Sequence, residues 1–216
     1  MESSQKQDKQ DPSTLNDANL KKEESPKLFS IGHSNHEMSV FIALLKQHRI
    51  DSIIDVRSHP YSKYSSHFNM RSLRSALESE RIKYAYLGAE LGGQPEEKSF
   101  YDREGRVLYD RIAESEAFRN ALDRVVREMQ TSRTAILCSE EDPSECHRHL
   151  LIGRVLRERG INLNHIRADG ALQTEQELVD LQKSKKQDLR QLDLFPQTRE
   201  TSQWKSIRSV SPKNQQ

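Results

Sequence analysis

Ser52-Ile53-Ile54-Asp55-Val56 is the stretch of sequence that indicates the fold most clearly. Its apolar residues form the kind of short run that suits a strand buried on both faces of a parallel sheet. Comparable runs stand on either side of it, at residues 27–31, 83–87, 134–138 and 163–166. Segments with apolar residues at helical spacing lie between these runs. Alternating strands and helices imply right-handed crossovers. We therefore predict an α/β fold with a single mainly parallel sheet and helices on both faces.

The segments between the strands predict the helices. Their expected limits are a helix that starts at the N-cap Ser39, a helix from the N-cap Asn69 to about Ile82, and helices over residues 113–130, 143–159 and 174–192. Ser and Asn favour the N-cap position because their side chains accept hydrogen bonds from the first free N–H groups of a helix. Gly160 favours an end to the helix that precedes it.

Composition divides the chain into a core and two polar ends. Residues 1–26 and 196–216 are too polar to bury surface that would offset their ordering entropy, so we expect disorder there. The expected parts are a tail over 1–26, an α/β core over 27–172, and a polar helix and tail over 173–216. The formal net charge of +1 creates no global field that would attract a polyanion.

The expected location is the cytoplasm. No apolar run reaches the roughly 18 residues that a membrane-spanning helix needs. Residues 1–26 also lack the apolar centre of a secretory signal. The two cysteines are too few for a disulfide scaffold.

Polar groups follow the predicted strands, at the edge where ligands bind in parallel sheets. Asp55 ends the second strand among apolar residues, and Arg57 is two positions further on. The two side chains point the same way if the strand continues. We predict a catalytic carboxylate that acts as acid, base or nucleophile and is held by the arginine. The alternative is a structural role, either as an ion pair at the strand end or as a helix cap.

The segment over residues 57–74 carries basic and aromatic side chains and no acidic one. Basic groups contact phosphates, and aromatic faces stack on bases. We predict that phosphates are contacted by Arg57, Lys63 and Arg71. We predict that a base stacks on Tyr61 or Tyr64. The other residues predicted to bind substrate are His33, Ser34, His59, Phe68, Asn69, Gly92 and Gly93. The alternative is an ordinary solvated loop with its aromatic residues in the core.

The fourth predicted strand ends at Cys138, and Cys146 follows in a segment that Asp142 would cap as a helix. Cys146 would then lie in the first helical turn, where the helix dipole and free N–H groups favour a thiolate. His147 and Arg148 add positive charge. This pattern indicates a thiol-dependent enzyme or redox sensor with Cys138 as the partner thiol. Cysteines that only pack in the core are the alternative.

Two further chemistries fit this segment less well. A thiol phosphatase or sulfurtransferase needs a loop that cradles an anion, and the acidic residues at 140–142 would repel one. A zinc site would use Cys138, Cys146, His147 or His149, but the usual closely spaced ligand pairs are missing. We therefore assign no metal ligand and leave the cofactor open.

Residues 191–195, Gln-Leu-Asp-Leu-Phe, are similar to the pentapeptide by which bacterial proteins bind the sliding clamp. In such peptides a few apolar anchors and a polar handle dock in a pocket. The predicted contacts are Gln191, Leu192, Leu194 and Phe195. The alternative is a helix end whose apolar side chains fold back on the domain.

The chain from about Lys27 to Gly170 resembles the bacterial family called domain of unknown function 488. The motifs that carry the resemblance are, in order, residues 31–35 (IGHSN), 55–60 (DVRSHP), 67–69 (HFN), 91–93 (LGG), and Cys138 with Pro143 and residues 146–148 (CHR). The resemblance implies an α/β core in which these polar motifs cluster. It supplies no reaction.

The combined patterns predict a protein that binds or acts on nucleic acid in DNA repair or replication, with Asp55 as a hydrolytic carboxylate. Two alternatives stay open: a thiol-dependent enzyme or redox sensor that uses Cys146 and Cys138, and a non-enzymatic adaptor that binds DNA or protein. The expected partners are DNA or a nucleotide and a bacterial sliding clamp. No membrane partner is expected.

Overall fold

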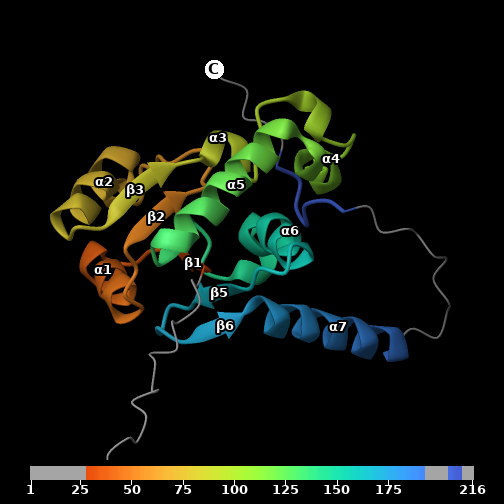
Figure 1. Ribbon diagram of the computed structural model, residues 1–216. Coiled ribbons are helices and arrows are strands. Elements are labelled where there is room, and N and C mark those ends of the chain that lie inside the picture. Colours follow the sequence, from red (N-terminus) through yellow and green to blue (C-terminus); the bar gives the residue numbers. More distant parts are fainter. Residues whose placement is uncertain (1–27, 193–203, 211–216) are drawn as a thin grey trace, which may run out of the picture.

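The computed structural model describes residues 28–192 and 204–210 (Figure 1). These residues form one six-stranded sheet with the strand order β3-β2-β4-β1-β5-β6. The strands are β1 (Leu28–Gly32), β2 (Ser52–Asp55), β3 (Lys83–Tyr86), β4 (Thr134–Cys138), β5 (Leu163–Ile166) and β6 (Leu172–Thr174). β1 to β5 are parallel, and β6 runs antiparallel to β5. The predicted α/β class is confirmed. β6 is a short strand that the sequence pattern missed.

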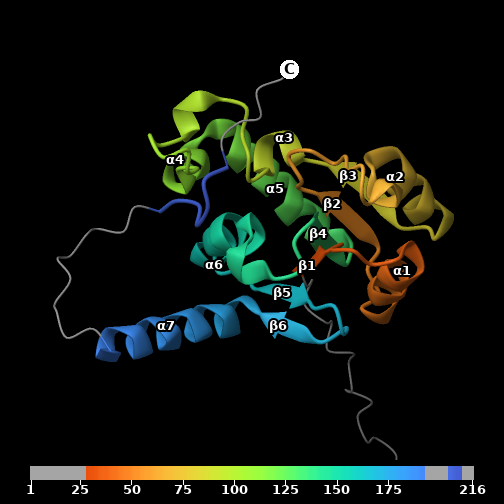
Figure 2. The same ribbon diagram turned by 180° about the vertical axis from the view of Figure 1, so that it is seen from behind.

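Helices cover both faces of the sheet (Figure 1 and Figure 2). The helices α1 (Met38–Gln47) and α2 (Met70–Ser79) pack in a core with Phe41 and Leu73. A second core, which includes Phe118, belongs to α3 (Gly88–Leu91), α4 (Tyr109–Glu114), α5 (Glu116–Thr131) and α6 (Arg154–Glu158). Burial of these apolar side chains is the main force that holds the layers together.

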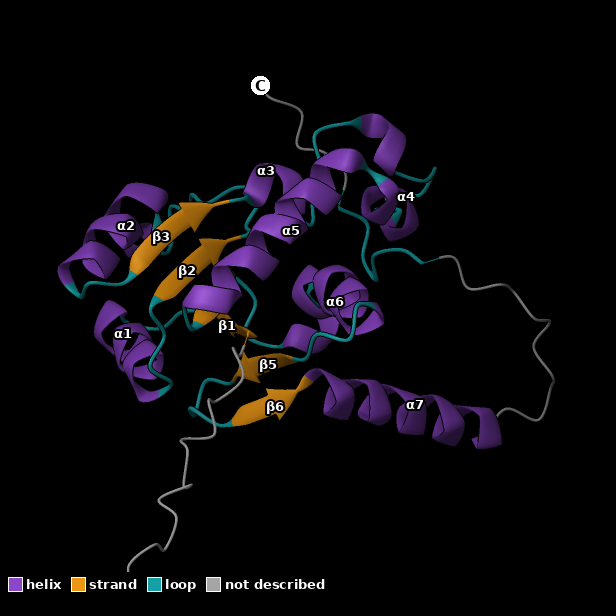
Figure 3. Cartoon of the chain, viewed as in Figure 1, coloured by secondary structure: helices purple, strands orange, loops and turns teal. Residues whose placement is uncertain are grey.

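The helix predicted over residues 113–130 is two helices, α4 and α5 (Figure 3). Ser115 separates them, and its Oγ accepts a hydrogen bond from the N–H of Phe118 at 3.2 Å. A serine in this position satisfies a free N–H and starts a new helix. The prediction of Ser39 as an N-cap is wrong, because α1 already begins at Met38.

The helix predicted over residues 143–159 is interrupted at the second cysteine. Pro143–Glu145 forms a single 3₁₀ turn, and Cys146 then has extended backbone angles, with φ −103° and ψ 146°. A π-helical turn over Arg148–Gly153 follows and leads into α6. Cys146 is therefore not inside the helix predicted over residues 143–159, but stands just before the second helical segment, where its carbonyl accepts from the N–H groups of His149 and Leu150 at 3.0 Å and 2.9 Å. Single π-helical turns are frequent at functional sites.

The connections that follow the neighbouring strands β1 and β4 pass over opposite faces of the sheet. β1 leads into α1 in one layer, while β4 leads into α6 in the other. Gly32 and Cys138 lie side by side at the carboxyl ends of these strands. In open α/β sheets, the crevice at such a switch point is where ligands bind.

The C-terminal part of the chain has two described pieces. The helix α7 (Glu175–Leu192) agrees closely with the predicted helix. Residues 204–210, which we call the C-terminal strap, are packed against the domain, so the disorder predicted for this stretch is wrong. Trp204 Nε1 donates to the carbonyl of Leu150 at 2.7 Å, and the N–H of Ser206 donates to the carbonyl of Val107 at 2.8 Å. These contacts are long-range, so local composition could not indicate them.

Several predictions fall on residues that the structure does not describe. The tail over 1–26 lies outside the described residues, and so do positions 193–195 of the clamp-like peptide. Gln191 and Leu192 are the last residues of α7. Within the described residues, none of the helices has the length and apolar composition that crossing a membrane requires.

Candidate functional site

A cavity of about 360 Å³ opens at the carboxyl ends of β2 and β4. Four further parts of the chain complete its wall, namely the turn after α3, the start of α4, the loop after β4 and the C-terminal strap. The lining residues from these parts that matter below are Gly93, Tyr109, Cys138, Glu140, Cys146, His147, Ser206 and Arg208. The volume falls in the range of small-molecule sites.

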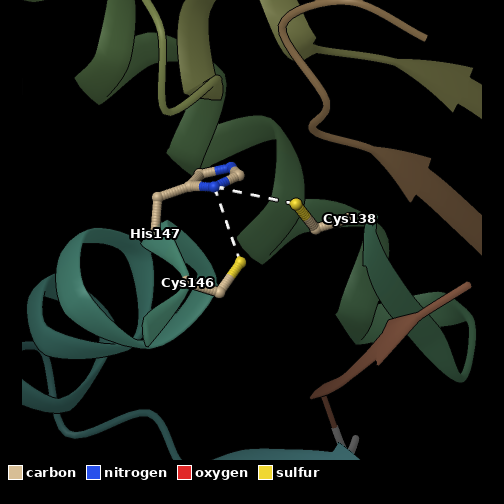
Figure 4. A group of neighbouring side chains, drawn as sticks. All are labelled: Cys138, Cys146 and His147. Carbon is tan, nitrogen blue, oxygen red and sulfur yellow. Dashed lines mark hydrogen bonds between the residues drawn. The ribbon is translucent and has the colours of Figure 1, made fainter. Parts of the chain in front are cut away.

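Two thiols and an imidazole meet on one wall of this cavity (Figure 4). The Nδ1 atom of His147 lies 3.8 Å from Cys138 Sγ and 3.7 Å from Cys146 Sγ. The three atoms all lie within 4.8 Å of one another. All three side chains are buried. The two cysteines are not joined in a disulfide. We call these three residues the sulfur cluster.

The orientation of the His147 ring is fixed by a hydrogen bond on the side away from the sulfurs. Its Nε2 lies 3.1 Å from the carbonyl oxygen of Val56, which can only accept, so Nε2 carries a proton. In the neutral ring, Nδ1 then presents its lone pair to the two sulfurs. The ring also packs against Gly93, where an added Cβ would lie 2.9 Å from the imidazole. Glycine is therefore required beside this histidine.

Arg148 supports the cluster from the interior. Its side chain is fully buried, and its Nε donates to Cys146 Sγ at 3.3 Å. The guanidinium also donates to Ser30 Oγ and to the carbonyls of Glu140 and Glu141. These bonds hold the loop after β4 over the end of β1. Gly32 permits that approach, because a Cβ there would lie 1.8 Å from the Glu140 carbonyl oxygen.

The two thiols differ in acidity. Burial alone would raise the pKa of Cys146, but a hydrogen bond from Cys138 and the charges of Arg148 and His147 outweigh it, so this pKa lies well below its ordinary value. The hydrogen bond to Cys146 and burial raise the pKa of Cys138 well above its ordinary value. The pKa of His147 is raised, because the Cys146 thiolate outweighs the effect of burial. Without a metal, Cys146 is thus the thiolate of the pair.

Glu140 is an exposed carboxylate beside the cluster. Its Oε2 lies 2.8 Å from Cys138 Sγ, which donates to it, and 3.6 Å from Cys146 Sγ. Sequence reasoning treated this residue only as a source of repulsion for an anion. The signal that would have singled it out is its place two residues after Cys138, which brings its carboxylate back to the sulfur.

Asp55 and Arg57 form a closed buried pair. Arg57 donates to Asp55 through Nε at 2.9 Å and Nη2 at 2.6 Å, and the hydroxyl of Tyr84 donates to the same carboxylate at 2.8 Å. Arg57 Nη1 donates to the Phe68 carbonyl. Asp55 has no exposed surface and does not line the cavity, whereas Arg57 is buried but lies on the cavity wall. This geometry is that of a structural ion pair rather than of a reacting carboxylate or a free phosphate-binding arginine.

The other predicted substrate contacts separate into three groups. His59, Tyr61 and Gly93 line the cavity. Three residues are exposed and lie away from the cavity, namely Lys63, Tyr64 and Arg71. The remaining predicted contacts, which the structure also places away from the cavity, are His33, Ser34, Phe68, Asn69 and Gly92.

His33 and Phe68 belong to the interior. Their rings stack with centroids 4.3 Å apart, and Phe68 also packs edge-on against Phe41. Burial and the charge of Arg57 lower the pKa of His33 to about 4, so it is neutral at pH 7. Asn69 stands at the N-cap of α2, but its Oδ1 accepts from the N–H of Ser62 at 2.7 Å instead of from the helix.

The family model described as Domain of unknown function DUF488 matches residues 37–155, more than half of the 216-residue chain. The chain belongs to the DUF488 family. The match covers the whole sulfur cluster and leaves the motif at 31–35 and the C-terminal strap outside. No curated protein and no solved structure shows significant similarity to this DUF488 chain.

Proposed function

We propose that this DUF488 protein is a zinc-dependent hydrolase whose metal ligands are Cys138, Cys146 and His147. The observation that carries the proposal is the near-equal distance from His147 Nδ1 to the two sulfurs, 3.8 Å and 3.7 Å. Near-equal distances to the two sulfurs fit a cation centred among the three atoms.

Tetrahedral zinc needs separations of this size. With Zn–S of about 2.3 Å and Zn–N of about 2.0 Å, a tetrahedral angle puts sulfur and nitrogen about 3.5 Å apart and two sulfurs about 3.8 Å apart. The three ligand atoms lie within 4.8 Å of one another. The nitrogen–sulfur distances exceed the tetrahedral value by a few tenths of an ångström, and the two sulfurs would have to approach by no more than about 1 Å. The two cysteines are far apart in sequence for a common zinc motif, and the turn at Pro143–Glu145 brings them together.

The groups behind the ligands support the same proposal. A histidine that binds a metal usually donates its other N–H to a carbonyl or carboxylate, which fixes the ring. His147 makes this bond to Val56. Arg148 donates to Cys146 Sγ, and such a bond offsets the negative charge of a metal-bound thiolate.

An open fourth position distinguishes a catalytic zinc site from a structural one. All three ligands line the cavity, so the free side of the cluster faces a space that a substrate can enter. Zinc held in this way would lower the pKa of water to about 7. Metal binding displaces the thiol proton that Cys138 now shares with Glu140. The Glu140 carboxylate is then free to accept a proton from water and to pass it to a leaving group.

We propose a nucleobase as the substrate, free or within a nucleotide or single strand. One histidine, two cysteines and a glutamate that is not a ligand are the parts that zinc deaminases use on cytosine and adenine. The cavity has a suitable volume, and His59 and Tyr61 offer aromatic surface at its wall. This substrate class keeps the nucleic-acid expectation from the sequence and moves the chemistry from Asp55 to the sulfur cluster.

The proposed reaction balances without a further reactant. Water adds to the ring carbon that bears the amino group, and the C–N bond to that group breaks. One water proton ends on the ring nitrogen, and Glu140 transfers the other to the departing nitrogen, so ammonia leaves and a carbonyl remains.

The test is ammonia release by zinc-loaded protein from cytosine, adenine and guanine, offered as bases, nucleosides and single-stranded DNA. Glu140→Gln should lower the rate by at least about 100-fold while zinc stays bound. Glu141→Gln is the matched control, because the Glu141 carboxylate pairs with Arg167 and does not line the cavity. Bound zinc without ammonia release from any of these compounds would overturn base deamination, and a protein that binds no zinc would overturn the proposal as a whole.

A further inference from the structure

Tyr109 is a buried polar side chain with no role in the reaction proposed above. It is the first residue of α4, is only 3% exposed, and lines the same cavity as the sulfur cluster. Buried tyrosine hydroxyls usually have a hydrogen-bond partner. Within the described residues, the hydroxyl of Tyr109 has none, and because it is not among the fully buried atoms that lack a partner, it keeps access to the cavity that this residue lines.

The position of Tyr109 is nevertheless well defined. Its backbone N–H donates to the carbonyl of Trp204 at 2.9 Å. The two rings pack edge to face with centroids 6.4 Å apart. Ser206 fixes the preceding residues through its Oγ, which accepts from the N–H of Val107 at 2.9 Å. The strap thus holds this ring in place, and the hydroxyl is left to the cavity.

We propose that the Tyr109 hydroxyl is a catalytic hydrogen-bond donor that contacts the substrate at the sulfur cluster. This inference rests on the proposed function. A phenol is protonated at neutral pH and donates one hydrogen bond. At the edge of a zinc site it would bind the oxygen or nitrogen on which negative charge develops when water adds to the base. A donor preorganised in this way typically contributes about 100-fold or more to the rate.

The proposal also assigns a role to the strap. Residues 204–210 lie outside the range that the DUF488 family model matches, although Tyr109 and the cluster lie inside it. The strap therefore positions a substrate-binding residue of the family domain from outside that domain. It also contributes Ser206 and Arg208 to the cavity wall.

The test uses the full chain loaded with Co²⁺ in place of zinc and acetohydroxamate as the probe. Thiolate ligation gives Co²⁺ a charge-transfer band, and the hydroxamate would occupy the open position and shift the visible spectrum. Tyr109→Phe should keep the charge-transfer band and weaken hydroxamate binding about tenfold, because one hydrogen bond to a bound anion is lost. Tyr101→Phe is the matched control, because the Tyr101 hydroxyl already donates to the Pro95 carbonyl at 2.8 Å.

The outcomes separate the two proposals. A normal charge-transfer band with the same hydroxamate Kd in wild type and Tyr109→Phe would overturn the role of Tyr109 alone. A wild-type protein without the band would overturn the metal centre and, with it, this role. A tenfold loss in Tyr109→Phe that Tyr101→Phe does not share supports the inference. In the zinc enzyme, the same variant should then lower kcat more than it raises KM.

Discussion

Two buried polar groups at the same edge of the sheet differ in how they are satisfied. The Asp55 carboxylate is closed, because Arg57 and Tyr84 donate to its two oxygens, and of this pair only Arg57 lies on the cavity wall. The sulfur cluster has its support on one side only, from Val56 and Arg148, and faces a cavity on the other. Both looked reactive in the sequence. The comparison teaches that a charged residue at a strand end is a candidate for chemistry only if the fold leaves one side of it free.

The first way to sharpen this comparison is to remove the closed pair. Asp55→Ala leaves the Arg57 charge buried without its partner, which costs about 3–5 kcal/mol of the free energy of unfolding. The measurement is urea unfolding, followed by zinc content of the fraction that remains folded. We expect a large loss of stability and an unchanged zinc content per folded molecule. A variant as stable as wild type would show that the pair is not structural.

Gly93→Ala tests the open cluster with one added methyl group. The new Cβ would lie 2.9 Å from the His147 ring, so the imidazole must move away from its present position. Displacement of a ligand from its supporting bond lowers metal affinity by about 10–100-fold. Competition with a chelator measures the zinc Kd. An unchanged Kd would show that this ring does not bind zinc.

A smaller effect is expected at Tyr84, which belongs to the closed pair. Tyr84→Phe removes one hydrogen bond to Asp55 while both Arg57 bonds remain, so the free energy of unfolding should fall by about 1–2 kcal/mol. Zinc content and ammonia release should not change. A loss of activity without a loss of stability would place Asp55 in the reaction after all.

The smallest effect is expected at the mouth of the cavity. Arg208 and Glu145 form an exposed ion pair there, and both side chains are more than half exposed. Exposed pairs contribute little, so Arg208→Ala should change the free energy of unfolding by no more than about 0.5 kcal/mol. Zinc affinity should stay as in wild type. A drop in zinc affinity would mean that the strap supports the metal centre itself and not only the cavity wall.

The sequence alone predicted the strands well and the site only in outline. Runs such as Thr134–Cys138 are short, apolar and bounded by polar segments, so their limits agree with the structure. Cys138, Cys146 and His147 are candidates from the sequence that the structure brings together, and their role in a reaction stays a prediction. Cys146 precedes a helical segment instead of lying inside one, and its sulfur also meets an imidazole and a guanidinium that sequence spacing did not place.

The remainder of the site depends on contacts between distant residues. Gly93, Tyr109 and Ser206 reach the cavity from three separate segments, Val56 supports His147 from a fourth, and no local pattern connects them. The strap was the largest error, because its few apolar residues looked too sparse to pack. Trp204 anchors it through a hydrogen bond to Leu150 and a contact with Arg154, whose guanidinium lies 4.1 Å from the ring centroid. Backbone hydrogen bonds from Ser206 and Val210 to the domain add to this anchor.

The zinc content of the purified full chain tests the central claim most directly. After zinc loading and removal of excess metal, wild type should retain one equivalent, and neither cysteine should react with a thiol reagent until a chelator is added. Cys146→Ser should retain none. A folded wild-type protein that holds no zinc, and in which Cys146 is alkylated rapidly at neutral pH, would contradict the metal centre and favour a thiol-dependent enzyme.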